Sequence, residues 1–216
     1  MLPFESRACH VMLDFPGFGA SPPPPEHWDT KDYADAIAQW IKDENLPPVF
    51  WVGHSFGCRV GVQIAAHHPE SIKALTFIAG AGLKRKRPLQ QKIYFYCKIK
   101  LFKFLKNFIP DGSLKDSLMT RFGSADYKSS GPMRKIFVRV VNEDLSEKAR
   151  TIQCPTILIY GEDDTETPPQ SGKRYSQLIK GAKLFLLEGQ DHYTLLQNGR
   201  HPVIKILNDF IKEQTN

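Results

Sequence analysis

Residues 48–67 read PVFWV, GHSFG and CRVGVQIAAH, and they join two patterns of different period. The run at residues 48–52 is apolar without polar alternation, which is typical of a strand buried on both faces. Residues 56–67 then place Val60, Ile64 and Ala65 at helical spacing, and Pro69 ends the pattern. The sequence therefore predicts a buried strand that turns directly into a helix.

The same alternation continues on both sides of this stretch. Apolar runs predict further strands at residues 10–14, 74–79, 156–160 and 183–187. Helical patterns cover residues 31–43, after the candidate cap Thr30, and residues 170–179 and 201–213. Strands that alternate with helices indicate an α/β fold with a mostly parallel sheet covered by helices on both faces.

One long segment interrupts the alternation. Residues 84–150 contain no convincing buried strand, and a connection of roughly 65 residues is too long for a bare loop. We expect a core of residues 1–83 and 151–216, with residues 84–150 forming an inserted, mostly helical cap.

Composition and charge bound the class of protein. The chain has 216 residues, of which 41% are apolar and 24% charged, so it is globular rather than disordered or collagen-like. The four cysteines are scattered without a CxxC pair, which indicates reduced thiols. Glu5 and Arg7 interrupt any signal-peptide core, and no apolar run reaches 18 residues. These features predict a cytoplasmic protein.

The net charge of +6 comes from one stripe. Residues 84–106 carry nine Lys or Arg and no acid, whereas the rest of the chain has 20 basic and 23 acidic residues. A nucleic-acid binder is therefore disfavoured. The plain interpretation of the stripe is a cap helix with solvated lysines over an apolar pocket. The sharper one is weak contact with an anionic membrane surface or with acidic substrates.

The segment GHSFG is the sharpest chemical signal. A serine on a tight turn between strand and helix projects its hydroxyl outward, and the flanking positions of such a sharp turn tolerate little beyond glycine. Ser55 is therefore the candidate nucleophile. A serine hydroxyl needs a neighbouring imidazole to take its proton and a carboxylate to orient that imidazole.

Partners for Ser55 are sought in loops that follow later strands. His192 lies in the loop after residues 183–187 and is favoured over His201, which opens the last helix. The acid comes from the loop after residues 156–160, where spacing alone does not choose among the four carboxylates. The candidates in that loop are Glu162, Asp163, Asp164 and Glu166. Asp191 adjoins His192 and is expected to be a solvated loop residue.

Taken together, GHSFG, GEDDTETP and the His192 loop resemble the α/β-hydrolase superfamily, and HVMLDFPGFGAS is similar to its strand and DxxGxGxS turn. The resemblance implies a triad of Ser55, Asp164 and His192, because Asp164 stands at the Asp of the family's GxxDxxxP pattern. It also implies that the Phe56 N–H serves the oxyanion hole. No cofactor or metal is implied.

The start of the chain departs from that pattern. Three strands that usually precede residues 10–14 are missing, so we expect an N-terminally truncated or mis-started form of the fold. The missing third strand would leave a gap beside residues 48–52, unless the flanking strands close up or another segment pairs with them. The loop that normally supplies the second oxyanion donor is lost as well, and losing one such donor typically costs about 100- to 1,000-fold in turnover.

The function expected from the residues and the resemblance is a serine hydrolase for a small or medium apolar carboxylic ester. The alternatives are a carbon–carbon bond hydrolase or small-peptide hydrolase with the same triad, and a non-catalytic member, which is either an inactive truncated form or a ligand-binding relative that keeps the pocket. The partner would be a small-molecule substrate, and neither the substrate's identity nor the oligomeric state follows from the sequence.

Overall fold

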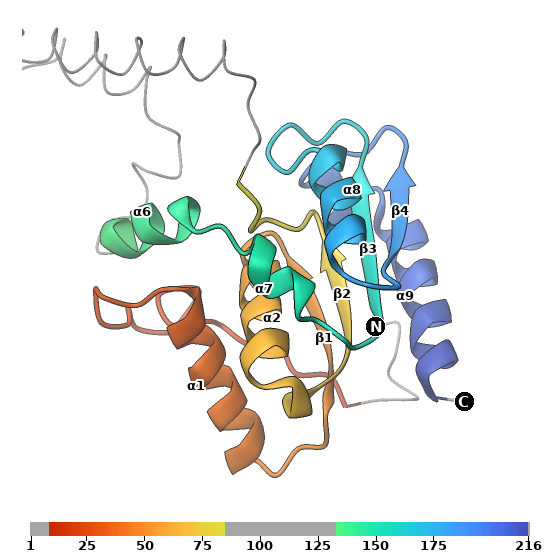
Figure 1. Cartoon of the computed structure of the whole chain (residues 1–216). Helices are drawn as coiled ribbons and strands as arrows, with labels where there is room; N and C mark the ends of the chain where they lie inside the picture. Colours follow the sequence, from red (N-terminus) through yellow and green to blue (C-terminus); the bar gives the residue numbers. More distant parts are fainter. Residues whose placement is uncertain (1–8, 85–132, 216) are drawn as a thin grey trace, which may run out of the picture.

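A computed structural model describes residues 9–84 and 133–215 of the chain, and these form an α/β structure around one parallel sheet (Figure 1). The sheet has the order β1-β2-β3-β4, and every neighbouring pair is parallel. The strands are β1 (Val49–His54), β2 (Ile72–Ile78), β3 (Thr156–Gly161) and β4 (Lys183–Leu187). The predicted fold class, a mostly parallel sheet with helices on both faces, is confirmed.

Helices cover the two faces of the sheet unequally (Figure 1). On one side lie α1 (Thr30–Asp43), α2 (Phe56–His67), α6 (Arg134–Asn142), α7 (Ser146–Arg150) and α8 (Pro169–Leu178). The other side is covered by α9 (Arg200–Thr215), together with the short 3-10 helix η3 (Thr194–Leu196). A second short 3-10 helix, η1 (Pro69–Ser71), joins α2 to β2.

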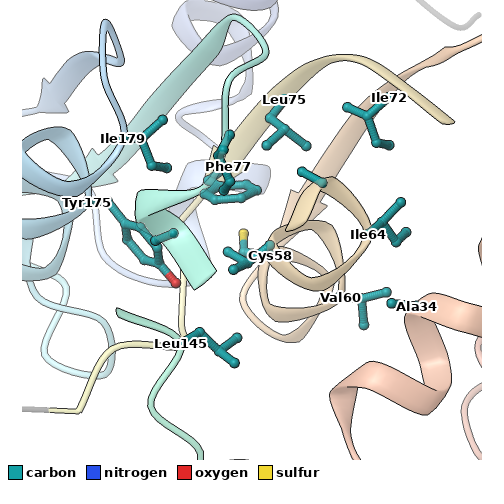
Figure 2. Close-up of a cluster of buried hydrophobic side chains, with 14 of the residues drawn as sticks. Ala34, Cys58, Val60, Ile64, Ile72, Leu75, Phe77, Leu145, Tyr175 and Ile179 are labelled. Carbon is teal, nitrogen blue, oxygen red and sulfur yellow. The ribbon is translucent and has the colours of Figure 1, made fainter. Parts of the chain in front are cut away.

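The two-residue period of the strands builds a separate core on each face. In β2, Leu75 and Phe77 point into the larger core below α2 and α8, while Ala74 and Ile78 belong to the core below α9. Figure 2 shows the larger cluster, in which the Phe77 ring meets the Tyr175 ring edge to face at 5.6 Å between centroids. Both ring side chains are fully buried. The sheet is thereby fixed between two apolar layers.

The expected strand at residues 10–14 is wrong. The chain has no regular secondary structure there, and Val11 and Met12 are 52% and 83% exposed. The physical reason is pairing: β1 bonds to β2 on one side, and no described segment occupies its other side. A strand needs a paired strand for its backbone N–H and C=O groups, and the sheet formed by the described ranges does not include residues 10–14. The flanking strands have therefore neither closed up nor found a substitute partner there.

The predicted N-cap residue of the first helix, Thr30, is also wrong, by one residue. Asp29, not Thr30, caps α1: its carboxylate accepts the N–H groups of Lys31 and Asp32, and Asp32 accepts the Asp29 N–H in return. Thr30 is instead fully buried, where the Glu143 carboxylate accepts hydrogen bonds from its amide and its hydroxyl. Thr30 thus ties α1 to the end of α6.

The proposed cap, residues 84–150, lies mostly outside the described residues, and so does the basic stripe beyond Lys84. Its described end consists of α6 and α7, which pack on the larger core through Ile136, Val140 and Ala149. Within the described ranges, none of the helices is both long and apolar enough to cross a bilayer.

Replacing Asp29 by Ala should lower the free energy of unfolding by about 1 kcal/mol, because two N–H groups at the start of α1 lose their acceptor. Urea unfolding followed by circular dichroism measures the loss. Asp29→Asn is the matched control and should stay within a few tenths of a kcal/mol of the wild type, because asparagine caps helices about as well as aspartate. Equal losses in both variants would contradict this assignment.

Candidate active site

Ser55 occupies a strained turn between β1 and α2. Its backbone has φ 48° and ψ −104°, a conformation that L-residues rarely adopt and that costs on the order of 1–3 kcal/mol. The Ser55 N–H donates to the Ile78 carbonyl at the end of β2, at 3.1 Å. Its side chain makes no capping bond to α2, so the hydroxyl is not used to cap the helix.

The two glycines of GHSFG are not equivalent. A Cβ added at Gly53 would lie 2.6 Å from the carbonyl carbon and oxygen of Gly57, so only glycine fits there. A Cβ at Gly57 would meet no atom within 4 Å. The expectation that the turn needs glycine on both sides therefore holds for Gly53 and is wrong for Gly57, because α2 leaves open space at that position.

The amide of Phe56 is available at the start of α2. The first N–H groups of a helix have no acceptor within the helix, and no described residue accepts a bond from this one. It belongs to the residue that follows Ser55, where an oxyanion donor is expected. A second donor is not identified among the described residues, so the loss of that donor stays a prediction.

Asp164 and His192 meet although 28 residues separate them in the chain. Asp164 Oδ2 lies 2.9 Å from His192 Nδ1, and the two side chains are 0% and 6% exposed. Asp164 also accepts the backbone N–H groups of Glu166 and Thr167 through Oδ1, at 2.8 and 2.7 Å. The carboxylate can therefore hold the proton on Nδ1 and leave Nε2 free to accept another.

The loop that carries His192 is fastened beside Ser55 by His54. The His54 Nε2–H donates to the His192 carbonyl at 3.0 Å, and the two imidazole rings lie 4.8 Å apart between centroids. No hydrogen bond joins the Ser55 hydroxyl to the His192 ring in the described part of the chain. The structure thus brings acid and imidazole into direct contact, with the imidazole next to the serine turn.

The other candidate acids do not contact His192 Nδ1 within the described residues. Glu162 and Asp163 are exposed, and the Asp191 carboxylate accepts the amides of Tyr193 and Thr194 instead of the imidazole. Glu166 is half exposed, and its Oε2 lies 3.8 Å from His192 Nε2, on the opposite side of the ring from Asp164.

The competing histidine, His201, is not part of this cluster in the described structure. His201 is exposed on the first turn of α9. No contact between its ring and any of the candidate acids is found within the described residues.

Charge and burial set the protonation of this cluster. Burial lowers the pKa of His192. The hydrogen bond that Nδ1–H donates to Asp164, together with the charges of Asp164, Glu166 and Asp191, outweighs burial, so the net pKa lies above its ordinary value of 6.5. For Asp164, burial raises the pKa, and the bonds from His192 and Thr167 outweigh this and lower it. The pair favours an ionised carboxylate beside a protonatable imidazole.

Sequence patterns do not predict a role in the site for two residues of this cluster. His54 has no predicted role beyond its place in GHSFG, and its ring holds the His192 backbone. Thr167, which is 8% exposed, contacts both Asp164 and His192 through its hydroxyl. The only sequence signal for Thr167 is its position three residues after Asp164 and directly before Pro168.

The rings of Phe15, Phe18 and Phe56 form an aromatic wall at the residue that follows Ser55. The Phe56 ring stacks on the Phe18 ring at 5.1 Å and meets the Phe15 ring edge to face at 5.8 Å. Phe18 is 43% exposed, so part of this wall faces solvent. An apolar group bound at Ser55 would have an aromatic surface beside it.

The tight turn at residues 14–21 places Phe18. Asp14 accepts the Ala20 N–H at 3.0 Å, and the Ser21 hydroxyl donates to the Asp14 carbonyl at 2.8 Å. Gly19 has φ 52°, and a Cβ there would lie 2.2 Å from the Asp14 carboxylate. These contacts explain why the DxxGxGxS pattern needs its Asp, second Gly and Ser.

In the described ranges, no group of three or more His, Cys, Asp or Glu side chains is arranged to hold a metal ion.

Sequence comparison assigns the chain to a family. A profile described as alpha/beta hydrolase fold matches residues 2–113, and one described as TAP-like protein matches residues 136–215. The first covers more than half of the chain, so this protein belongs to the α/β-hydrolase fold family.

Curated relatives indicate the class of enzyme. A monoacylglycerol lipase of Xenopus laevis is 24% identical over 98% of this chain and 70% of the lipase. A pimeloyl-[acyl-carrier protein] methyl ester esterase of Chromobacterium violaceum is 25% identical over 89% of this chain and 80% of its own length. A 2-hydroxy-6-oxo-2,4-heptadienoate hydrolase of Pseudomonas putida is 22% identical over 98% and 81%. The relatives are hydrolases, which supports hydrolase function for this chain.

Solved structures agree on the fold. An esterase from Exiguobacterium antarcticum superposes with a TM-score of 0.67, at 17% identity, over 92% of this chain and 79% of the esterase. This similarity supports the fold and carries no information about the substrate.

Replacing Gly53 by Ala should lower the free energy of unfolding by about 1–3 kcal/mol, because the new Cβ meets the Gly57 backbone. The matched control is Gly57→Ala, which adds the same methyl group into open space and should be neutral or slightly stabilising in α2. Thermal and urea unfolding compare the two variants. A Gly53→Ala protein as stable as Gly57→Ala would contradict the steric argument.

Replacing Glu166 by Gln should lower the pKa of His192, because a negative charge near Nε2 is removed. An NMR titration of the His192 ring measures the pKa, which in the wild type should lie above 6.5. Glu162→Gln, in the same loop, should leave it unchanged. An unchanged or higher pKa in Glu166→Gln would show that Glu166 does not act on the ring.

Proposed function

We propose that this protein is a serine hydrolase that cleaves a small or medium apolar carboxylic ester through an acyl-enzyme. The observation that carries the proposal is the buried hydrogen bond between Asp164 and His192, at 2.9 Å, beside the strained turn that presents Ser55. Acid, imidazole and alcohol in this relation are the parts that nucleophilic acyl transfer needs.

In the first half-reaction, Ser55 Oγ attacks the ester carbonyl carbon while His192 Nε2 takes the hydroxyl proton. Asp164 stabilises the imidazolium through Nδ1–H, and the Phe56 N–H donates to the oxyanion. The intermediate then collapses: the bond to the alkoxy group breaks, and the leaving alcohol receives the proton from Nε2. For this transfer the imidazole must come within hydrogen-bond reach of Ser55 when substrate is bound.

In the second half-reaction, a water molecule replaces the alcohol. His192 Nε2 takes a proton from the water, the resulting hydroxide adds to the acyl carbonyl, and Ser55 leaves with the returned proton. The products are a carboxylic acid and an alcohol. This cycle uses side chains of the protein and one water, and it requires His192 to be neutral before each attack.

The aromatic wall of Phe15, Phe18 and Phe56 supports an apolar acyl or alcohol group. The similarity to a monoacylglycerol lipase and to a methyl ester esterase supports ester cleavage. The hydrolase of Pseudomonas putida favours a second candidate, cleavage of a carbon–carbon bond beside a ketone. A panel of acyl esters of increasing chain length, run beside a vinylogous diketone, separates the two candidates.

A fluorophosphonate probe should label the wild type at Ser55 and should not label Ser55→Ala, because an activated hydroxyl attacks the phosphorus. Turnover of p-nitrophenyl esters should fall by roughly 10,000-fold or more in Ser55→Ala. Ser176→Ala removes a hydroxyl that bonds only to its own helix at Lys173, and it should label and turn over like the wild type.

Mass spectrometry of the labelled peptide identifies the modified residue. A folded wild-type protein that takes no label and cleaves no ester would favour the non-catalytic alternative. A label on another serine would overturn the assignment of Ser55.

A further inference from the structure

The Thr167 hydroxyl lies between the acid and the imidazole of the proposed triad. Its Oγ1 is 2.7 Å from Asp164 Oδ2, 3.1 Å from His192 Nδ1 and 3.0 Å from the Ala79 carbonyl oxygen. The side chain is nearly buried, so no bulk water competes for these contacts. Three polar partners around one hydroxyl restrict how its single hydrogen can be used.

The carbonyl of Ala79 and the carboxylate of Asp164 can only accept hydrogen bonds. Whichever of them receives the Thr167 hydrogen, the lone pairs of Oγ1 remain to face Nδ1. An Nδ1 that carries a proton can then donate to both Asp164 and Thr167. An Nδ1 without a proton would have to accept the single Thr167 hydroxyl hydrogen, for which the Ala79 carbonyl and the Asp164 carboxylate also compete. The arrangement therefore favours the tautomer with the proton on Nδ1.

Ala79 links this contact to the serine turn. It follows Ile78, whose carbonyl accepts the Ser55 N–H, and its own N–H donates to Ile159 in β3 at 2.8 Å. Ala79 has φ 48°, a strained conformation for a residue with a Cβ. The hydroxyl of Thr167 thus bonds to a backbone segment that also holds the nucleophile.

We propose that Thr167 is a positioning residue, which fixes the His192 ring in its plane and on the Nδ1–H tautomer so that Nε2 is free for the Ser55 proton. The inference rests on the proposed function, because the tautomer matters only if His192 acts as the base. Thr167 touches neither substrate nor reacting atoms, so its role is carried through Asp164 and His192.

The test compares Thr167→Val, Thr167→Ser and the remote control Thr151→Val. Valine keeps the shape but loses the hydroxyl, and kcat should fall about tenfold with KM within about twofold of the wild type. Serine keeps the hydroxyl and should restore kcat to within about threefold. Thr151 is exposed, and its hydroxyl bonds to the Lys148 carbonyl, so Thr151→Val should behave as the wild type.

Nitrogen-15 NMR of the His192 ring supplies a readout that a merely structural role would not move. The wild type and Thr167→Ser should show one tautomer with the proton on Nδ1, and Thr167→Val should show a population protonated on Nε2. A folded Thr167→Val protein with wild-type kcat and a single Nδ1–H tautomer would overturn the proposal. If valine prevents folding, Thr167→Ala is judged by the same two measurements.

Failure of this inference is distinguishable from failure of the proposed function. A wild type that takes no fluorophosphonate label refutes the hydrolase mechanism, while the tautomer of His192 and its dependence on Thr167 are still measured by NMR. A labelled wild type with an unaffected Thr167→Val refutes only the role of Thr167.

Discussion

The site depends on the parallel orientation of the four strands of the sheet. Because all four strands run in the same direction, their carboxyl ends lie at one edge, and the residues that follow them are brought together. Ser55 follows β1, Ala79 follows β2, Asp164 follows β3, and His192 lies in the loop after β4. A reversed strand would carry its residue to the opposite edge, so the apolar layers that hold the register also hold the chemistry.

At the carboxyl ends of the strands, hydrogen bonds hold the backbone beside its strained residues. Ser55 and Ala79 both have positive φ, and neither is glycine. The segment after β2 is held by two further hydrogen bonds, since the buried Tyr160 and Tyr175 hydroxyls donate to the carbonyls of Gly80 and Ala81 at 2.8 and 2.7 Å. Fixed backbone around a strained serine is what a preorganised nucleophile requires.

Most of the fold follows from local pattern. The helix at residues 56–67 and the strand at residues 183–187 have the predicted bounds, because their apolar spacing is regular and their ends are marked by Pro69 and by polar loops. Residues 10–14 have the composition of a strand but do not join the sheet of the described residues, and strand pairing is a property of the folded chain. Thr30 and Asp29 are both good capping residues, and only the burial of Thr30 against Glu143 decides between them.

The site was predictable to the extent that chemistry limits residue type. The turn motif singles out Ser55, and chain order favours His192, but spacing alone does not distinguish Asp164 from the other three carboxylates in its loop. The resemblance to the family picked Asp164, and the 2.9 Å contact with His192 supports that choice. Thr167 and His54 carry no such mark, because a hydroxyl or a ring becomes informative only when its buried partners are known.

The central claim is that Ser55, His192 and Asp164 act as one unit at the edge of the sheet. A crystal structure of the protein after reaction with a phosphonate ester tests it most directly. The account predicts phosphorus on Ser55 Oγ, with His192 Nε2 within about 3 Å of an adduct oxygen and Nδ1 still bonded to Asp164. An unmodified Ser55, or an imidazole turned away from the adduct, would contradict it.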